Sequence, residues 1–287
     1  SFIILLVYIF AYNNIYSQDE DIIAKFEART HFYKYFTIPY RLFIPEEYDS
    51  TKIYPLVLVL HGADVKGNDN LRHIQNTRMA TSWADPINQE KYPCFVVAPQ
   101  CPLHSDWTSP PQIPVTVNYI LDLLVTEFSV DENRIYVSGL SLGGLGTWHL
   151  INLYPDRFAA AVPMCGVGYP DDVDNIAHIP VWNFHGQQDR TVTVNYSRDM
   201  MNAYEEIGHQ VVYTHAHYRD RTGLPDSIIE MHIKAHSHLM YTEYARKRHS
   251  IGAQFTCDYK YLFPWVFSKY KLQTDAIEIT NLKSYQT

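Results

Sequence analysis

The sequence of 287 residues has no long basic run, no internal repeat and no low-complexity tract. Acidic residues outnumber basic ones by 31 to 23, so the formal net charge is −8. A chain with this balance lacks a basic stripe that could follow a phosphate backbone, and we therefore expect no nucleic-acid partner. The hydrophobic share of 46% is enough to bury a large core, which favours one ordinary globular domain.

Cysteine is scarce, with four residues in the whole chain. In an oxidising compartment four cysteines can pair in three ways, and the sequence does not choose among these pairings. Cys165 follows the apolar run 159–164, so we expect it to be an inert thiol in the core. The other cysteines are Cys94, Cys101 and Cys257.

The apolar block at the start of the chain, residues 1–12, is too short to span a bilayer. It is followed by polar residues and resembles the hydrophobic part of a signal peptide, although a buried strand or a short anchor is the alternative. We expect residues 1–18 to be a signal-peptide-like segment, 25–271 to form one domain and 272–287 to be a tail or linker. This predicts a secreted or periplasmic protein whose mature form has no membrane partner; the sequence leaves its oligomeric state open.

Apolar runs and helical patterns alternate along the chain. Strands separated by helices indicate right-handed crossovers in a parallel sheet, so the predicted fold class is α/β, a three-layer α/β/α sandwich with a mostly parallel sheet. Long excursions at 63–92 and 213–226 interrupt this pattern and are expected to be loops. The predicted strands are 40–44, 55–60, 94–98, 134–137, 159–164, 179–184 and 227–233, and the predicted helices are 115–127, 143–153 and 196–207.

The sequence G-L-S-L-G at 139–143 lies between a predicted strand and a predicted helix. This is the arrangement of a nucleophile elbow, in which two glycines let the chain turn sharply enough to expose a serine hydroxyl above the sheet. Ser141 is therefore the predicted nucleophile. The backbone N–H groups of Leu142 and of Ala63, in the loop after the strand 55–60, are the predicted oxyanion donors.

A serine nucleophile needs a base and a carboxylate that orients the base. Asp189 follows the apolar run 179–184, and its place beyond the end of a buried strand predicts the carboxylate. The base is predicted to be His238, because it lies in the loop between the expected last strand 227–233 and a helix-like stretch at 239–248. His236 and His249 remain the alternatives for this role.

Two further residues are predicted to bind substrate, and none to bind a metal. Trp107 and Gln100 are the predicted pocket residues, with Trp107 alternatively a core residue. The pairs His215 with His217 and His236 with His238 could each face one side of an extended chain, yet no Cys or carboxylate has matching spacing for a metal site. We therefore expect no metal and no organic cofactor.

Five blocks in order resemble the polyhydroxybutyrate-depolymerase-like and feruloyl-esterase-like branch of the α/β-hydrolases, a group that includes predicted peptidases. They are P-L-V-L-V-L-H-G, C-F-V-V-A-P-Q-C-P, D-E-N-R-I-Y-V-S-G-L-S-L-G-G-L-G-T-W, F-A-A-A-V-P-M-C-G and F-H-G-Q-Q-D. The resemblance implies the triad Ser141, Asp189 and His238, because an aromatic, Thr and Glu follow the family's histidine much as Tyr241, Thr242 and Glu243 follow His238. It departs at Ser237, where the family has Gly, and the spacing to Trp265 suits His249 better.

The residues and the resemblance together predict a secreted serine carboxylesterase that works through an acyl-enzyme, with feruloylated or acetylated polysaccharide as the expected kind of substrate. A small-molecule ester, a lipid-like ester or a peptide is left open as the substrate. The alternatives are a serine peptidase of the same fold and a non-catalytic hydrolase-like module that binds glycans.

Overall fold

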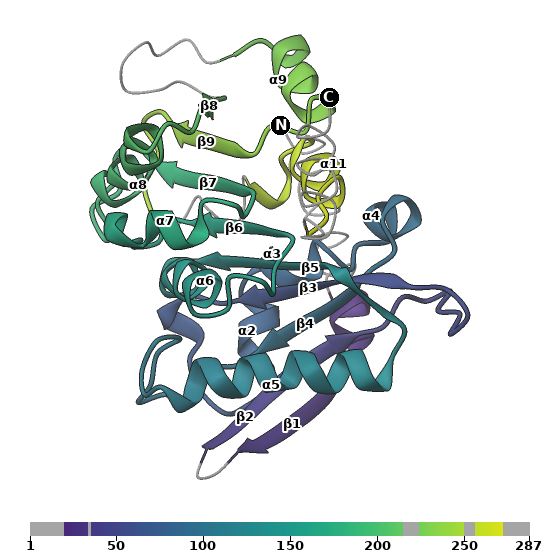
Figure 1. The fold of residues 1–287 in the computed structure, drawn as a ribbon. Helices are drawn as coiled ribbons and strands as arrows, with labels where there is room; N and C mark the ends of the chain where they lie inside the picture. The colour runs from purple at the N-terminus through teal and green to yellow at the C-terminus, as the bar shows by residue number, and fades with distance from the viewer. Residues whose placement is uncertain (1–19, 34–35, 215–223, 250–255, 272–287) are drawn as a thin grey trace, which may run out of the picture.

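A computed structural model describes residues 20–33, 36–214, 224–249 and 256–271 (Figure 1). The predicted signal segment 1–18 and tail 272–287 lie outside the described residues, as do His215 and His217. Within the described part no helix is long and apolar enough to cross a membrane. All four cysteines are described, all are buried, and none forms a disulfide.

The strands form one nine-stranded sheet in the order β1-β2-β4-β3-β5-β6-β7-β9-β8. Figure 1 shows this order from bottom to top. The first strands, β1 and β2, pair antiparallel, β2 pairs antiparallel with β4, and the remaining pairs are parallel. The strands are β1 Glu27–Tyr33, β2 Phe36–Phe43, β3 Tyr54–Leu60, β4 Phe95–Pro99, β5 Val130–Leu140, β6 Ala160–Met164, β7 Val181–Gly186, β8 Val211–Tyr213 and β9 Leu239–Tyr244.

Two hydrophobic cores cover the two faces of the sheet. In β3, Leu56, Leu58 and Leu60 belong to one core, and Val57 and Val59 belong to the other, as expected for a strand that is buried on both faces. The predicted three-layer, mostly parallel fold is therefore confirmed. The first core contains residues of α5 Gln112–Glu127, α6 Leu142–Leu153, α7 Val173–Ile176 and α8 Asn195–Glu206; the second contains residues of α2 Arg72–Gln75, α3 Arg78–Thr81, α9 Asp226–Lys234 and α11 Leu262–Phe267.

The end of the chain departs from the predicted pattern. The predicted strand 227–233 is the helix α9, which begins after Pro225 and buries Ile229 while Ile233, one turn later, packs on the same core. The stretch 239–248, predicted to be helical, begins with the fully buried strand β9. Short apolar runs fit both periods, and burial separates the two elements: every residue of β9 is buried, whereas in α9 only Ile229 is. The last strand consequently starts after His238 rather than before it.

The predicted loop at 63–92 contains four short helices. The first of them, η1 Ala63–Val65, follows β3 at the carboxyl edge of the sheet, and α4 Pro86–Lys91 ends the segment before β4. The excursion is thus an ordered cap on the sheet between neighbouring parallel strands.

Candidate active site

Ser141 occupies a strained turn between β5 and α6. Its backbone dihedrals are φ 58° and ψ −114°, a region that residues with a β-carbon rarely adopt. The turn is held by the Ser141 N–H, which donates to the Met164 carbonyl at 2.8 Å. This geometry lifts the side chain out of the sheet edge, as a nucleophile elbow requires.

The glycines on either side of Ser141 are required by close packing. A β-carbon at Gly143 would lie 2.0 Å from the Leu60 carbonyl oxygen, and one at Gly139 would lie 2.2 Å from the Gly143 carbonyl oxygen. Neither backbone group can move aside without breaking the elbow or the strand. Tight packing against neighbouring backbone atoms therefore requires glycine at both positions.

Ser141, His249 and Asp189 form a continuous hydrogen-bonded row. The Ser141 hydroxyl is 2.7 Å from Nε2 of His249, and Nδ1 of the same ring is 2.6 Å from Oδ2 of Asp189. Because an ionised carboxylate only accepts, Nδ1–H donates to Asp189 and Nε2 is left to accept the serine proton. The row has the geometry of a nucleophile, a general base and a carboxylate that orients the base.

The sheet brings these three residues together. Ser141 follows β5, Asp189 follows β7 and His249 follows β9, and these strands are parallel members of the run β5-β6-β7-β9. Because the carboxyl ends of parallel strands meet at one edge, the three side chains converge there although they are distant in sequence.

The prediction of His238 as the base is corrected by this arrangement. His238 directly precedes β9, its carbonyl accepts from the Val181 N–H at the start of β7, and it therefore lies at the amino edge of the sheet. Its Nε2 donates to the Ala177 carbonyl at 2.9 Å, and burial lowers the pKa of this imidazole. His236 is exposed in the turn before it. Because the last strand was assigned to 227–233 instead of Leu239–Tyr244, the base was predicted before β9 although it lies after it. The spacing to Trp265, which suited His249, was the available signal in the sequence.

Asp189 is buried, and burial alone would raise the pKa of its carboxyl group. Hydrogen bonds outweigh this effect and hold the pKa well below its ordinary value. Oδ1 accepts the N–H groups of Thr191 and Val192 at 2.8 and 3.0 Å, and Oδ2 lies 3.2 Å from Nε2 of His185 as well as beside His249. His185 is a contact of the carboxylate that the sequence reasoning missed, although it stands in the F-H-G-Q-Q-D block.

The predicted oxyanion donors lie beside the nucleophile. Leu142 is the first residue of α6 and Ala63 the first of η1, positions whose N–H groups have no acceptor within their own helix. A β-carbon on Gly62, which precedes Ala63, would be 3.7 Å from that of Ser141, so the loop after β3 packs directly on the elbow. The Leu142 and Ala63 amides therefore stay the predicted oxyanion donors.

The predicted pocket residues Gln100 and Trp107 are both buried, with exposed fractions of 0% and 1%. The Gln100 amide accepts from the Asn70 N–H and donates to the Val65 carbonyl, while the Trp107 indole N–H donates to the His61 carbonyl. These contacts support the loop after β3. We therefore correct both assignments. The Gln100 amide and the Trp107 indole N–H form hydrogen bonds inside the protein, so these residues support the loop instead of contacting substrate.

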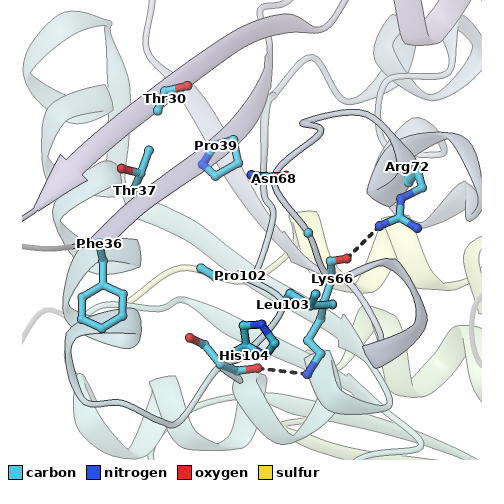
Figure 2. A pocket seen from close by; sticks show the side chains of 12 residues that line it. Thr30, Phe36, Thr37, Pro39, Lys66, Asn68, Arg72, Pro102, Leu103 and His104 are labelled. Atoms are coloured by element: carbon cyan, nitrogen blue, oxygen red, sulfur yellow. Dashed lines mark hydrogen bonds between the residues drawn. The ribbon is translucent and has the colours of Figure 1, made fainter.

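A pocket of about 850 Å³ lies at the same edge of the sheet, between strands β1 and β2 and the loops that follow β3 and β4. Figure 2 shows Lys66 reaching across it to the backbone near His104; the Lys66 ammonium donates to the Ser105 carbonyl at 3.1 Å. The loop that begins at Gly62 beside Ser141 ends at the pocket wall. The lining combines polar with apolar side chains, among them Thr30, Phe36, Thr37, Lys66, Asn68 and Arg72.

Comparison with known proteins gives matches to hydrolases. Residues 118–254 match the prolyl oligopeptidase family. The chain is 26% identical over 93 residues to a bifunctional acetylxylan esterase/xylanase, XynS20E, of Neocallimastix patriciarum. The matched region covers 32% of this chain and 14% of that protein. It is 29% identical over 127 residues to poly(3-hydroxyalkanoate) depolymerase C of Paucimonas lemoignei. That matched region covers 40% of this chain and 28% of the depolymerase.

Among solved structures, the chain is similar to a thermostable esterase with a TM-score of 0.73 and 34% identity, over 87% of this chain and 64% of that one. The chain thus spans less than two thirds of the length of each of these proteins. The predicted α/β-hydrolase fold and the predicted resemblance to esterases are confirmed.

Proposed function

We propose that the protein is a serine carboxylesterase with Ser141 as nucleophile, His249 as general base and Asp189 as the carboxylate that orients the base. The single observation that carries this proposal is the row of short contacts from the Ser141 hydroxyl through His249 to Asp189, at 2.7 and 2.6 Å. A protein that only binds glycans has no need of a proton relay.

In the proposed reaction His249 Nε2 takes the Ser141 proton while Oγ attacks the ester carbonyl carbon. The N–H groups of Leu142 and Ala63 stabilise the oxyanion of the tetrahedral intermediate. Its collapse breaks the bond to the alcohol oxygen, and the imidazolium returns the proton to the leaving alcohol. Water then attacks the acyl-enzyme by the same route and releases the acid. Asp189, held ionised by its hydrogen bonds, keeps the Nδ1–H tautomer throughout.

The proposed substrate is a carboxylic ester attached to a polysaccharide. The pocket beside the loop after β3 supports this, because Lys66, Asn68 and Thr37 offer hydrogen-bonding groups to sugar hydroxyls next to an apolar Phe36 wall. A relative's name, acetylxylan esterase, points the same way. With Asn68→Ala we expect a higher KM for acetylated xylan and an unchanged KM for p-nitrophenyl acetate, and equal effects on both would remove the pocket from the proposal.

A serine peptidase is the second candidate, because residues 118–254 match the prolyl oligopeptidase family. The same triad can attack an amide, so geometry alone does not separate the two reactions. Methyl ferulate and p-nitrophenyl acetate, assayed beside aminoacyl p-nitroanilides, do separate them. The esterase proposal requires a kcat/KM for esters that exceeds that for the anilides by at least a factor of about 100.

Export is also proposed, on the apolar block at 1–12. Expression from the full-length gene, followed by N-terminal sequencing of protein from the medium, tests it. Cleavage near residue 18 supports export; uncleaved protein retained in the cells opposes it.

The direct test of the esterase proposal is Ser141→Ala beside the matched control Ser138→Ala. Ser138 lies three residues earlier in β5, and its buried hydroxyl has no hydrogen-bond partner among the described residues, so alanine should replace it at little cost. We expect Ser141→Ala to lower kcat by about 10⁴ to 10⁶ and Ser138→Ala to leave it near the parent value. Ester turnover that survives Ser141→Ala would remove the proposal.

A further inference from the structure

The thiol of Cys165 lies next to the histidine and the carboxylate of the triad. One ligand atom from each of Cys165, Asp189 and His249 can be chosen so that all three lie within 4.8 Å of one another. A thiolate, an imidazole and a carboxylate are the donor set that Zn²⁺ prefers in proteins. The esterase reaction proposed above uses the imidazole and the carboxylate but not the thiol.

The fold directs Cys165 to this position. It directly follows β6, which lies between β5 and β7, and its N–H donates to the Phe184 carbonyl of β7 at 2.8 Å. Its backbone has φ 47°, in the left-handed region that favours glycine. Met164, the residue before Cys165, also contacts the nucleophile elbow, because its carbonyl accepts the Ser141 N–H.

We propose that Cys165, Asp189 and His249 form an inhibitory site for a zinc-like divalent ion. The ion would take the place of the proton between His249 Nδ1 and Asp189 Oδ2, with the Cys165 thiolate as third ligand and water as the fourth. Nδ1 is the nitrogen that can share an ion with the carboxylate, because Nε2 faces Ser141 on the other side of the ring. The inhibition, unlike the binding, rests on the proposed esterase function.

The site needs only small adjustments to accept the ion. In a tetrahedral zinc site the nitrogen, oxygen and sulfur ligands lie about 3.3 to 3.6 Å apart. The Nδ1 to Oδ2 distance of 2.6 Å must widen by about 1 Å, and the ligand atoms of the three residues, which can be chosen within 4.8 Å of one another, must settle at these separations. The His249 side chain is 22% exposed, so it can move and can admit the ion.

The consequence for catalysis follows from counting protons. The thiol loses its proton to solvent when the sulfur binds the ion, and the Nδ1 proton of His249 is replaced. A neutral imidazole bound through Nδ1 carries its proton on Nε2. Nε2 then donates toward Ser141 and can no longer accept the serine proton, so kcat falls while substrate binding is spared.

Cobalt is the probe, because Co²⁺ bound to a thiolate gives a charge-transfer absorption that Co²⁺ in water lacks. We expect the full-length protein to show this band with one Co²⁺ per chain, and Zn²⁺ to abolish it by displacement. Zn²⁺ should lower kcat for p-nitrophenyl acetate without a matching change in KM. A band that is absent, or that needs more than one ion per chain, would overturn the proposal.

Variants assign the site. Cys165→Ser and His249→Gln should each abolish the cobalt band, and Cys165→Ser should raise the Zn²⁺ concentration for half-inhibition at least tenfold. The matched control is Cys257→Ser, which should keep both the band and the inhibition. The Cys257 thiol is buried in the second hydrophobic core, where it packs on Met79. A band that persists in His249→Gln, which remains a valid test if Cys165→Ser fails to fold, contradicts the site.

The two proposals can fail separately. Ser141→Ala should keep the cobalt band although it cannot turn over an ester. A band in a parent protein that hydrolyses no ester would retain the metal site and remove the esterase proposal. Ester turnover without a band would do the reverse.

Discussion

His249 Nε2 lies 2.7 Å from the hydroxyl of Ser141, a residue 108 positions earlier in the chain. The contact exists because β9 runs parallel to β7 and ends at the same edge of the sheet as β5. His249 lies in the loop after β9, so we expect the orientation of its ring to depend on the contact between Nδ1 and the Asp189 carboxylate.

Asp189→Asn tests that dependence. The amide can donate to Nδ1, which favours the wrong tautomer and places a proton on Nε2. We expect kcat to fall by about 10⁴ with the fold retained, as in triads where the carboxylate is neutralised. Steady-state kinetics with circular dichroism checks this, and a loss of less than tenfold would show that the carboxylate does not orient the base.

His185 is predicted to be a positioning residue for Asp189. Its Nε2–H is shared between the Val192 carbonyl at 2.9 Å and Asp189 at 3.2 Å, while Nδ1 is 2.7 Å from the Ser197 hydroxyl. His185→Gln should misplace the carboxylate and lower kcat by about 10- to 100-fold with KM unchanged. His178→Gln, at an exposed histidine, is the control. Equal losses in kcat and in thermal stability at both positions would indicate a purely structural role.

Acid should destabilise the protein through His61 and His73. Burial lowers the pKa of His61 to about 4 and that of His73 to about 3. His61 is held neutral by its contacts, since Nδ1–H donates to the Gly62 carbonyl and Nε2 accepts the Cys101 N–H. Between the unfolded pKa near 6.5 and these values the unfolded state binds more protons, so stability is lost as pH falls.

Urea unfolding at pH 7 and pH 4.5 measures this loss, which we expect to total about 2 to 5 kcal/mol. The variant His73→Gln keeps a donor for the Ala98 carbonyl but cannot titrate, so its stability should depend less steeply on pH. A free energy of unfolding that is the same at both pH values would refute the account of these two histidines.

Gly143→Ala should disrupt the elbow itself. The added methyl would lie 2.0 Å from the Leu60 carbonyl oxygen, inside van der Waals contact with backbone. Gly62→Ala is the comparison, because its closest neighbour is the Asp64 carboxylate at 3.1 Å, a side chain that can move. We expect Gly143→Ala to lower the free energy of unfolding by about 3 kcal/mol or more, and Gly62→Ala to lower it by less than about 1.5 kcal/mol. Equal melting temperatures would contradict the packing argument.

The sequence was informative wherever a motif and a buried strand coincided. The predicted strands 55–60, 94–98, 134–137, 159–164 and 179–184 overlap β3 to β7, because strands that are buried on both faces read as continuous apolar runs. The elbow at Ser141 and the loop position of Asp189 followed directly from these strands.

The sequence failed where local patterns were ambiguous. The run 227–233 contains enough isoleucine for a strand, yet it follows Pro225 and Asp226, which start the helix α9. That exchange placed the base at His238 instead of His249. Gln100 and Trp107 were misjudged for another reason: their hydrogen bonds to Val65 and His61 depend on how the loop after β3 folds, which no local pattern encodes.

The most direct test of the account compares kcat for p-nitrophenyl acetate in His249→Ala and His238→Ala. Both side chains are imidazoles of partial burial near the same strand, but only His249 contacts Ser141. We predict a loss of about 10⁴ to 10⁶ for His249→Ala and a loss of less than about tenfold for folded His238→Ala. Near-normal turnover by His249→Ala, or abolished turnover by a folded His238→Ala, would contradict the relay through His249.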